Sequence, residues 1–204
     1  FAAQMINYPV LPGTSGHLGG GVLLAILLGP ASGVLTMAAI LIVQCLLFQD
    51  GGLLALGCNV LNMGVVPCLL GWWLYRLIGG GAASAWRRHA AAVVACVAGV
   101  TAGAALVPLQ ALVSGVLRIP FLHFLGVMVG VHVLIGLVEG AITAAVLEYL
   151  RRVRPSVLGA AAADRLSARA TLASILVTAG ALAGVVCWFA SGSPDGLEWS
   201  CEPA

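Results

Sequence analysis

Apolar stretches long enough to cross a membrane follow one another along almost the whole chain. Hydrophobic residues make up 61% of the 204 residues and charged residues only 8%, and the mean hydropathy is +1.10. A soluble protein of this size needs a far more polar surface. The apolar segments are about 20 residues long, as membrane helices are, whereas barrel strands would be about ten residues long and alternating. The sequence therefore predicts an all-α fold, a polytopic transmembrane helical bundle.

Breaks in the apolar pattern divide this bundle into about six membrane segments. Because the first segment reads as the end of a helix already under way, at least one helix is expected to precede residue 1. Residues 1–190 are predicted to form one membrane domain, followed by a short external tail over 191–204. After the end of a helix over 1–9, the six expected segments are a short or kinked helix over 17–29 and spans over 31–48, 53–78, 90–117, 121–150 and 170–190.

Arginine positions predict which loops face the cytoplasm, because cytoplasmic loops of membrane proteins are rich in positive charge. The chain has nine arginines and no lysine, and eight of the nine lie within 76–89 or 151–169. With these two loops in the cytoplasm, the loop before His17, the turn at Asp50 and the C-terminal tail all face outside. The net charge of +2 comes from basic residues confined to loops and predicts no nucleic-acid partner.

A glycine-rich polar break over 11–20 holds the main candidate site. Irregular backbone in a bilayer is tolerated only where it lines a cavity or packs against protein. His17 follows Thr14 and Ser15, whose hydroxyls can cap the next helix and hold the imidazole ring. A helix N-terminus repels cations, so a metal here needs strong nitrogen donors, and a nitrogen-rich square-planar set suits Ni²⁺ or Cu²⁺. We expect His17 to be a metal ligand; the plainer alternative is a histidine that only forms interior hydrogen bonds.

Four further polar residues inside apolar segments are candidates for supporting roles. His132 and Glu139 are seven residues apart and share one helix face, and ionisable residues within a membrane indicate function by default. Asn59 and Asn62 must form hydrogen bonds, because a buried amide without a partner is costly. For all four, the alternative is a plain polar contact between helices.

Three other ionisable residues carry weaker expectations. Asp50 precedes two glycines and is expected to cap a turn rather than to attract cations. His89 is expected in an inner loop and His123 at the outer interface, and neither pattern indicates a function.

Two other classes of protein fit parts of the sequence. Gly13 to Gly16 matches the pattern G-x-S-G, so Ser15 with His132 as base could form an intramembrane serine hydrolase, provided that the two side chains lie within hydrogen-bond reach. A four-residue match in a glycine-rich chain is a weak signal. A non-catalytic membrane assembly subunit, whose polar residues only link helices, is the remaining alternative.

Longer stretches of the chain carry a family resemblance. With the residues of 1–9, 13–18, 25–30 and 56–64, and with His132 and Glu139 further on, the chain resembles the NikM/CbiM family. Members of that family are substrate-capturing S components of energy-coupling-factor (ECF) transporters for nickel and cobalt. The segment 194–199, Pro-Asp-Gly-Leu-Glu-Trp, resembles the PDGLE element that is fused to such components or encoded beside them.

The resemblance implies a non-enzymatic transport subunit of a bacterial or archaeal plasma membrane. Its substrate would be Ni²⁺ or Co²⁺, and the residues of the motif favour nickel. The ion would bind at an outward-facing site with His17 as one ligand. The implied partners are a transmembrane T component, two ATPase subunits, a small auxiliary membrane subunit and lipid. The chain itself has no P-loop pattern for ATP. The residues implied to position the loop around the site are Thr14, Ser15, Asn59, Asn62, His132 and Glu139.

One departure from the family pattern concerns the other metal ligands. In the family they come from a chain start with the sequence Met-His, whose amino group, amide and imidazole enter the site. This sequence begins at Phe1. We therefore expect either that the segment precedes residue 1 in the natural protein or that metal binding is impaired in this form.

Overall fold

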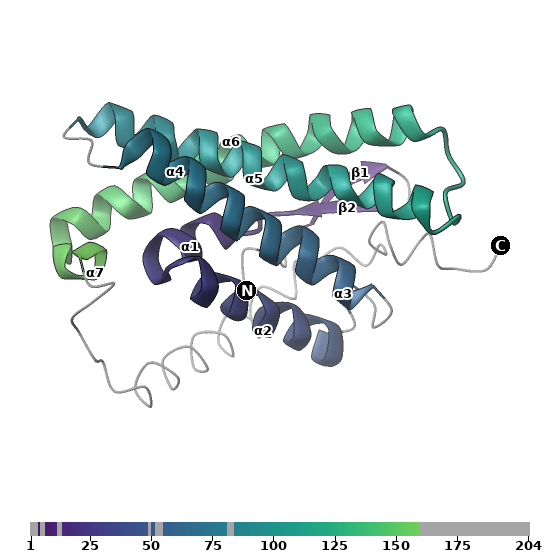
Figure 1. Cartoon of the computed structure of the whole chain (residues 1–204), viewed down its shortest axis with the longest axis horizontal. Coiled ribbons are helices and arrows are strands. Elements are labelled where there is room, and N and C mark those ends of the chain that lie inside the picture. Colours follow the sequence, from purple (N-terminus) through teal and green to yellow (C-terminus); the bar gives the residue numbers. More distant parts are fainter. Residues whose placement is uncertain are drawn as a thin grey trace.

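The fold is a bundle of long helices with a small β-hairpin against it. The computed structural model describes residues 4, 7–11, 14–48, 50–51, 55–80 and 84–159. Figure 1 shows the two longest helices, α5 (Ala85–Val113) and α6 (Phe121–Val153), side by side, with the hairpin strands next to them. The other helices of this part are α1 (Gly21–Leu28), α2 (Pro30–Phe48), α3 (Leu56–Asn59), α4 (Trp72–Gly79) and α7 (Pro155–Gly159).

Four helical segments in the described part are long and apolar enough to cross a membrane. This confirms the predicted multi-pass helical bundle and the four predicted spans between residues 31 and 150. The predicted span over 170–190 and the tail over 191–204 lie outside the described residues. The four segments are Pro30–Phe48, Leu56–Gly79, Ala85–Val113 and Phe121–Val153.

The prediction of a helix end over residues 1–9 is wrong. Residues Asn7–Leu11 form strand β1, which pairs antiparallel with strand β2 (Thr14–His17), and Asn7 lies opposite His17. Pro9 explains the difference, because proline lacks the backbone N–H that a helix needs and drives the preceding residue into an extended conformation. Hydropathy alone does not distinguish a short buried strand from the last turns of a helix.

The predicted short helix after His17 is present as α1. Its eight residues span only about 12 Å at 1.5 Å per residue, too little to cross a bilayer. Gly29 follows it with a φ of +88°, a conformation that side chains other than glycine rarely adopt, and α2 begins at the next residue. The two helices pack closely, because a Cβ on Gly33 would lie 2.9 Å from the Ala25 Cα.

The span from Leu56 to Gly79 is wound partly as a π-helix. Between α3 and α4 lie two π-helical segments, η2 (Val60–Val65) and η3 (Pro67–Gly71). Pro67 cannot donate a backbone hydrogen bond, which accounts for a break in regular α winding near it. This span lies tightly against α5: a Cβ on Gly103 would overlap the carbonyl oxygen of Asn62.

Helix α6 packs closely on α5 at Gly136 and Gly140. A Cβ on these glycines would lie 2.7 Å from the Val97 Cα and 2.6 Å from the Val93 Cα. A second pair of glycines on α6, Gly126 and Gly130, is exposed and has no atom of the described chain within 4 Å of such a Cβ. In that half of α6 the contact with α5 is made by Phe124 and Met128, which pack with Ala104.

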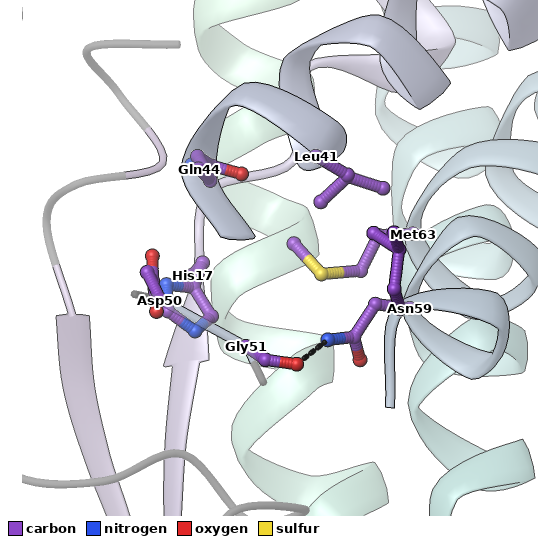
Figure 2. A pocket seen from close by; sticks show the side chains of 8 residues that line it. His17, Leu41, Gln44, Asp50, Gly51, Asn59 and Met63 are labelled. Carbon is purple, nitrogen blue, oxygen red and sulfur yellow. Dashed lines mark hydrogen bonds between the residues drawn. The ribbon is translucent and has the colours of Figure 1, made fainter. Parts of the chain in front are cut away.

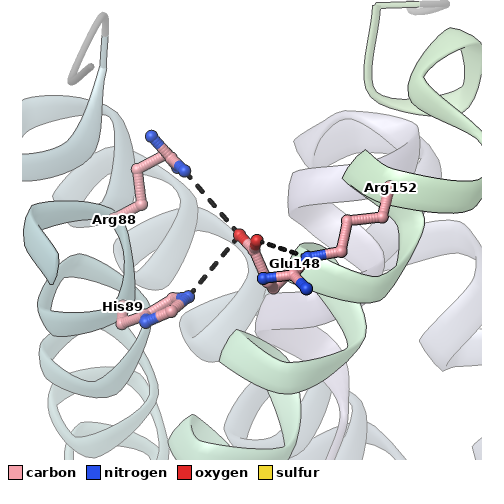
Figure 3. A network of polar contacts seen from close by, with 4 residues as sticks. All are labelled: Arg88, His89, Glu148 and Arg152. Atoms are coloured by element: carbon pink, nitrogen blue, oxygen red, sulfur yellow. Dashed lines mark hydrogen bonds and ion pairs between the residues drawn. The ribbon is translucent and has the colours of Figure 1, made fainter. Parts of the chain in front are cut away.

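A cluster of charges joins α5 and α6 at one end of the bundle (Figure 3). The carboxylate of Glu148 lies 2.9 Å from the Arg152 guanidinium, 3.7 Å from that of Arg88 and 3.7 Å from the imidazole of His89. Figure 1 shows α7, which follows α6, at this end, and the connection between α5 and α6 at the opposite end. The bundle thus has one end rich in arginine.

The contact at Gly103 generates a testable prediction. Gly103→Ala should destabilise the protein by about 1–3 kcal/mol, the usual cost of overpacking, because the new methyl group meets the backbone of Asn62. Gly126→Ala is the matched control, because its Cβ would meet no atom of the described chain and alanine is the better helix former. Thermal unfolding of both variants in detergent measures the difference. Equal melting temperatures for the two variants would contradict the close approach.

Candidate metal site around His17

Strand β2 places His17 because its glycine lets the strand lie directly on α6. A Cβ on Gly16 would come within 2.8 Å of the Ile135 side chain and 3.2 Å of the His132 ring. A larger residue at position 16 would require the Ile135 side chain and the His132 ring to shift. The imidazole of His17, the last residue of the strand, is half-buried at this point.

His17 lies on one side of a small pocket formed by segments that are distant in the sequence (Figure 2). The pocket has about 20 Å³ of room for a guest, enough for one water molecule or one ion. Strand β2, the end of α2, the turn after it and the start of the span Leu56–Gly79 each contribute. The lining residues are His17, Leu41, Gln44, Asp50, Gly51, Leu56, Asn59 and Met63.

A hydrogen bond to the main chain selects the tautomer of His17. Its Nδ1 lies 2.9 Å from the carbonyl oxygen of Gln4. A carbonyl oxygen can only accept, so Nδ1 carries the proton and the neutral ring keeps its lone pair on Nε2. Metal-binding histidines are commonly oriented by such a bond at the nitrogen that does not bind the metal.

Oxygen and sulfur groups line the pocket together with His17. Asp50 supplies a carboxylate, and Gln44 and Asn59 supply amides. Figure 2 shows the Met63 thioether pointing between Leu41 and Gly51 toward the pocket. Imidazole and thioether favour soft or borderline transition metals, whereas a carboxylate supplies the negative charge that a divalent cation requires.

The structure places the two asparagines in different positions. The Asn59 side chain lines the pocket and donates a hydrogen bond of 2.9 Å to the carbonyl oxygen of Gly51, which holds the turn after α2. Asn62 is buried outside the pocket lining and pairs with Gln110 of α5 through two reciprocal amide hydrogen bonds of 2.8 and 2.9 Å. Asn62 therefore joins two helices.

The other predicted residues lie in or behind the strand. Thr14 and Ser15 belong to β2, but their side chains lie outside the described part of the structure. The His132 ring packs against Gly16 and its Nδ1–H donates to the carbonyl oxygen of Met128 at 2.8 Å. Glu139 is 4% exposed and accepts a hydrogen bond of 2.8 Å from the backbone N–H of Gly19. Both α6 residues thus contact the segment that carries His17.

Three residues of the pocket were missed or interpreted differently from the sequence. Gln44 is an uncharged amide within an apolar span and is only 3% exposed, so the rule that buried amides need partners applies to it as well. Asp50 was expected only to cap a turn, although it is the first acidic residue in the chain and the next is Glu139. Met63 has no distinguishing sequence signal, because a methionine in an apolar span is usually a core residue.

The pocket brings together two of the residue types that most often bind metals in proteins. His17 and Asp50 both line it. Among the described residues, no group of three or more histidine, cysteine, aspartate or glutamate side chains is close enough to hold a metal ion.

Comparisons with known proteins agree with the multi-pass helical fold. The family profile described as "Cobalt uptake substrate-specific transmembrane region" matches residues 1–157, and the profile "PDGLE domain" matches residues 169–204. A protein of Archaeoglobus fulgidus named as a fused nickel transport protein, NikMN, is 43% identical over 176 residues. The match covers 86% of this chain but only 58% of that protein. The cobalt transport protein CbiM of Sorangium cellulosum is 33% identical over 166 residues, which cover 78% of this chain and 71% of that protein.

Solved structures show the same relationship. A crystal structure of a truncated transition metal transporter superimposes with a TM-score of 0.66 at 28% identity, over 74% of both chains. A second transition metal transporter gives a TM-score of 0.66 at 29% identity, over 74% of this chain and 70% of the other. The chain therefore belongs to the CbiM/NikM family of multi-pass membrane components for nickel and cobalt transport.

Proposed function

We propose that this protein is the substrate-capture component of an ECF-type importer for Ni²⁺ or Co²⁺. The observation that carries the proposal is the pocket at the end of β2, where the proton of His17 is committed to Gln4 and Nε2 remains available for a metal. Asp50 on the same pocket supplies a compensating negative charge. The transported ion, Ni²⁺ or Co²⁺, is the substrate, and His17 is its first proposed ligand.

Further ligands are needed to complete the coordination. The family resemblance implies a chain start with the sequence Met-His, which would bring an amino group, a backbone amide and a second imidazole. Such a nitrogen-rich set is typical of square-planar Ni²⁺. We propose that these groups enter the pocket beside His17 when that segment is present.

The proposed partners follow from what the chain itself does not supply. No ATP-binding motif is present in the sequence, so we propose that a transmembrane T component and two ATPase subunits drive release of the ion to the inside. A small auxiliary membrane subunit is a further proposed partner. The ion is only bound and released, so the proposed function requires no catalytic residue.

The proposed orientation places the His17 pocket outside and the Glu148 cluster in the cytoplasm. The cluster lies where α5 begins and α6 ends, and the surrounding loop segments hold most of the arginines. The connection between α5 and α6, at the opposite end, holds only Arg118. Positive charge of this kind favours the cytoplasmic side.

The hydrolase with Ser15 and His132 receives no support from these observations. The relatives are named as transport proteins, and the Ser15 side chain lies outside the described part of the structure. The alternative of a purely structural assembly subunit predicts that metal binding, if any, would persist without the His17 ring.

The first prediction tests His17. The protein with its natural chain start should bind roughly one Ni²⁺ per chain, and His17→Ala should abolish this binding, because the pocket loses its nitrogen donor. Isothermal titration calorimetry with NiCl₂ measures the stoichiometry and affinity of this binding. The matched control is His123→Ala, which removes an exposed histidine at the start of α6. Binding by His17→Ala as strong as that of the wild type would contradict the proposed site.

The second prediction tests Asp50. Asp50→Asn removes the negative charge but keeps the shape, and we expect the affinity for Ni²⁺ to fall by about tenfold, equivalent to 1.4 kcal/mol. Asp50→Glu, which keeps the charge, should lose less. If the asparagine variant binds as the wild type does while the glutamate variant binds more weakly, Asp50 acts through its shape and not through its charge.

The third prediction tests the orientation. Ser84 and Ser114 are exposed and lie just before α5 and just after it, at opposite ends of that helix. In a background with the native cysteines replaced, a membrane-impermeant maleimide should label Ser114→Cys in intact cells. Ser84→Cys should react only after the cells are permeabilised. The reverse pattern would overturn the proposed sidedness.

A further inference from the structure

Three hydrogen bonds connect the imidazole of His17 to a carboxylate buried in α6. The ring Nδ1–H donates to the carbonyl oxygen of Gln4 at 2.9 Å. The side-chain amide of Gln4 donates to the carbonyl oxygen of Gly19 at 2.7 Å. The backbone N–H of Gly19 donates to Oε2 of Glu139 at 2.8 Å. These bonds form a continuous path from ring to helix, which we call the Gly19 relay.

The side chains of the Gly19 relay are enclosed by protein. Gln4 is 1% exposed and Glu139 is 4% exposed, so water does not compete for these hydrogen bonds. The relay is therefore a buried connection between β2 and α6.

Each of the two side chains also keeps one oxygen without a partner. Oε1 of Glu139 and Oε1 of Gln4 are buried and accept no hydrogen bond from the described residues. Leaving a buried acceptor unsatisfied is costly. The hydrogen bonds that these two side chains do form hold the backbone C=O and N–H of Gly19, two residues after His17.

We propose, on the basis of the proposed function above, that Glu139 is a positioning residue that orients the His17 ring for metal binding through Gly19 and Gln4. The relay requires an acceptor at Oε2 of Glu139, and an amide oxygen meets that requirement as well as a carboxylate oxygen does. The proposal therefore predicts that geometry matters and charge does not. Removing a partner that orients a metal-binding histidine typically lowers metal affinity by about 10- to 100-fold.

The test combines substitutions at position 139 with two measurements. Glu139→Gln keeps the acceptor, whereas Glu139→Ala removes it. Glu148→Gln is the matched control, since it makes the same change on the same helix at the far end from the relay. Calorimetry measures Ni²⁺ affinity, and nitrogen NMR of histidine-labelled protein without metal reports which ring nitrogen of His17 carries the proton. The His17 signals are identified by their loss in His17→Ala.

The expected result is that the wild type, Glu139→Gln and Glu148→Gln share one tautomer, with the proton on Nδ1, and the same Ni²⁺ affinity. Glu139→Ala should show mixed tautomers and an affinity lower by about tenfold or more. If Glu139→Ala keeps both the tautomer and the affinity, the proposal is overturned. It is equally overturned if Glu139→Gln is as impaired as Glu139→Ala, because charge would then be the property that matters.

Two further outcomes keep the result interpretable. If Glu139→Ala does not fold, Gln4→Ala breaks the same relay at its other side chain and should cause the same loss of the tautomer; retention of the tautomer in that variant overturns the proposal. If the wild type binds no Ni²⁺, the proposed function fails. The His17 tautomer, measured without metal, still shows whether the Gly19 relay orients the ring.

Discussion

The pocket depends on an extended stretch of backbone that lies against membrane-spanning helices. Each N–H and C=O group in such a place needs a partner, because the surroundings offer little water. Pairing between β1 and β2 supplies partners along the hairpin. Beyond the end of β2, the side chains of Gln4 and Glu139 bind the two polar groups of Gly19. Without these partners the strand could not stay beside α6.

The bundle separates its stabilising contacts from its candidate site. Small residues allow α6 to pack closely on α5, and α5 to pack closely on the span Leu56–Gly79. The amide pair of Asn62 and Gln110 joins that span to α5. The Glu148 cluster closes the arginine-rich end. The pocket lies apart from these contacts, between α2, β2 and the start of the span Leu56–Gly79. A rigid scaffold can therefore hold a site whose ligands come from irregular segments.

The features that could be predicted from the sequence were those with a local physical signal. Span lengths follow from the bilayer thickness, and four of them were placed to within a few residues of the observed helices. His17 stood out because a polar, glycine-rich break interrupts the apolar pattern. The β-hairpin was missed because a run of apolar residues fits a strand and a helix end equally well, and Pro9 was the only local sign against the helix.

The partners of His17 could not be predicted, because they are set by tertiary packing. Gln44 and Met63 reach the pocket from spans 27 and 46 positions further along the chain. No periodicity relates residues so far apart, and each side chain alone resembles ordinary core. The sequence also could not separate Asn59 from Asn62, which are only three positions apart. Asn59 holds the turn at Gly51, whereas Asn62 binds Gln110 of α5.

The π-helical winding of the span Leu56–Gly79 has a consequence for the length of that span. An α-helix turns by about 100° for each residue, so deleting one residue of η2 between Met63 and Pro67 would rotate the part of the span before the deletion against the part after it by about that angle. Asn59 and Met63, on the pocket side, could then no longer keep their present direction while Pro67 stays against Gly99 of α5. The number of residues between the pocket and the α5 contact is therefore as constrained as their identity.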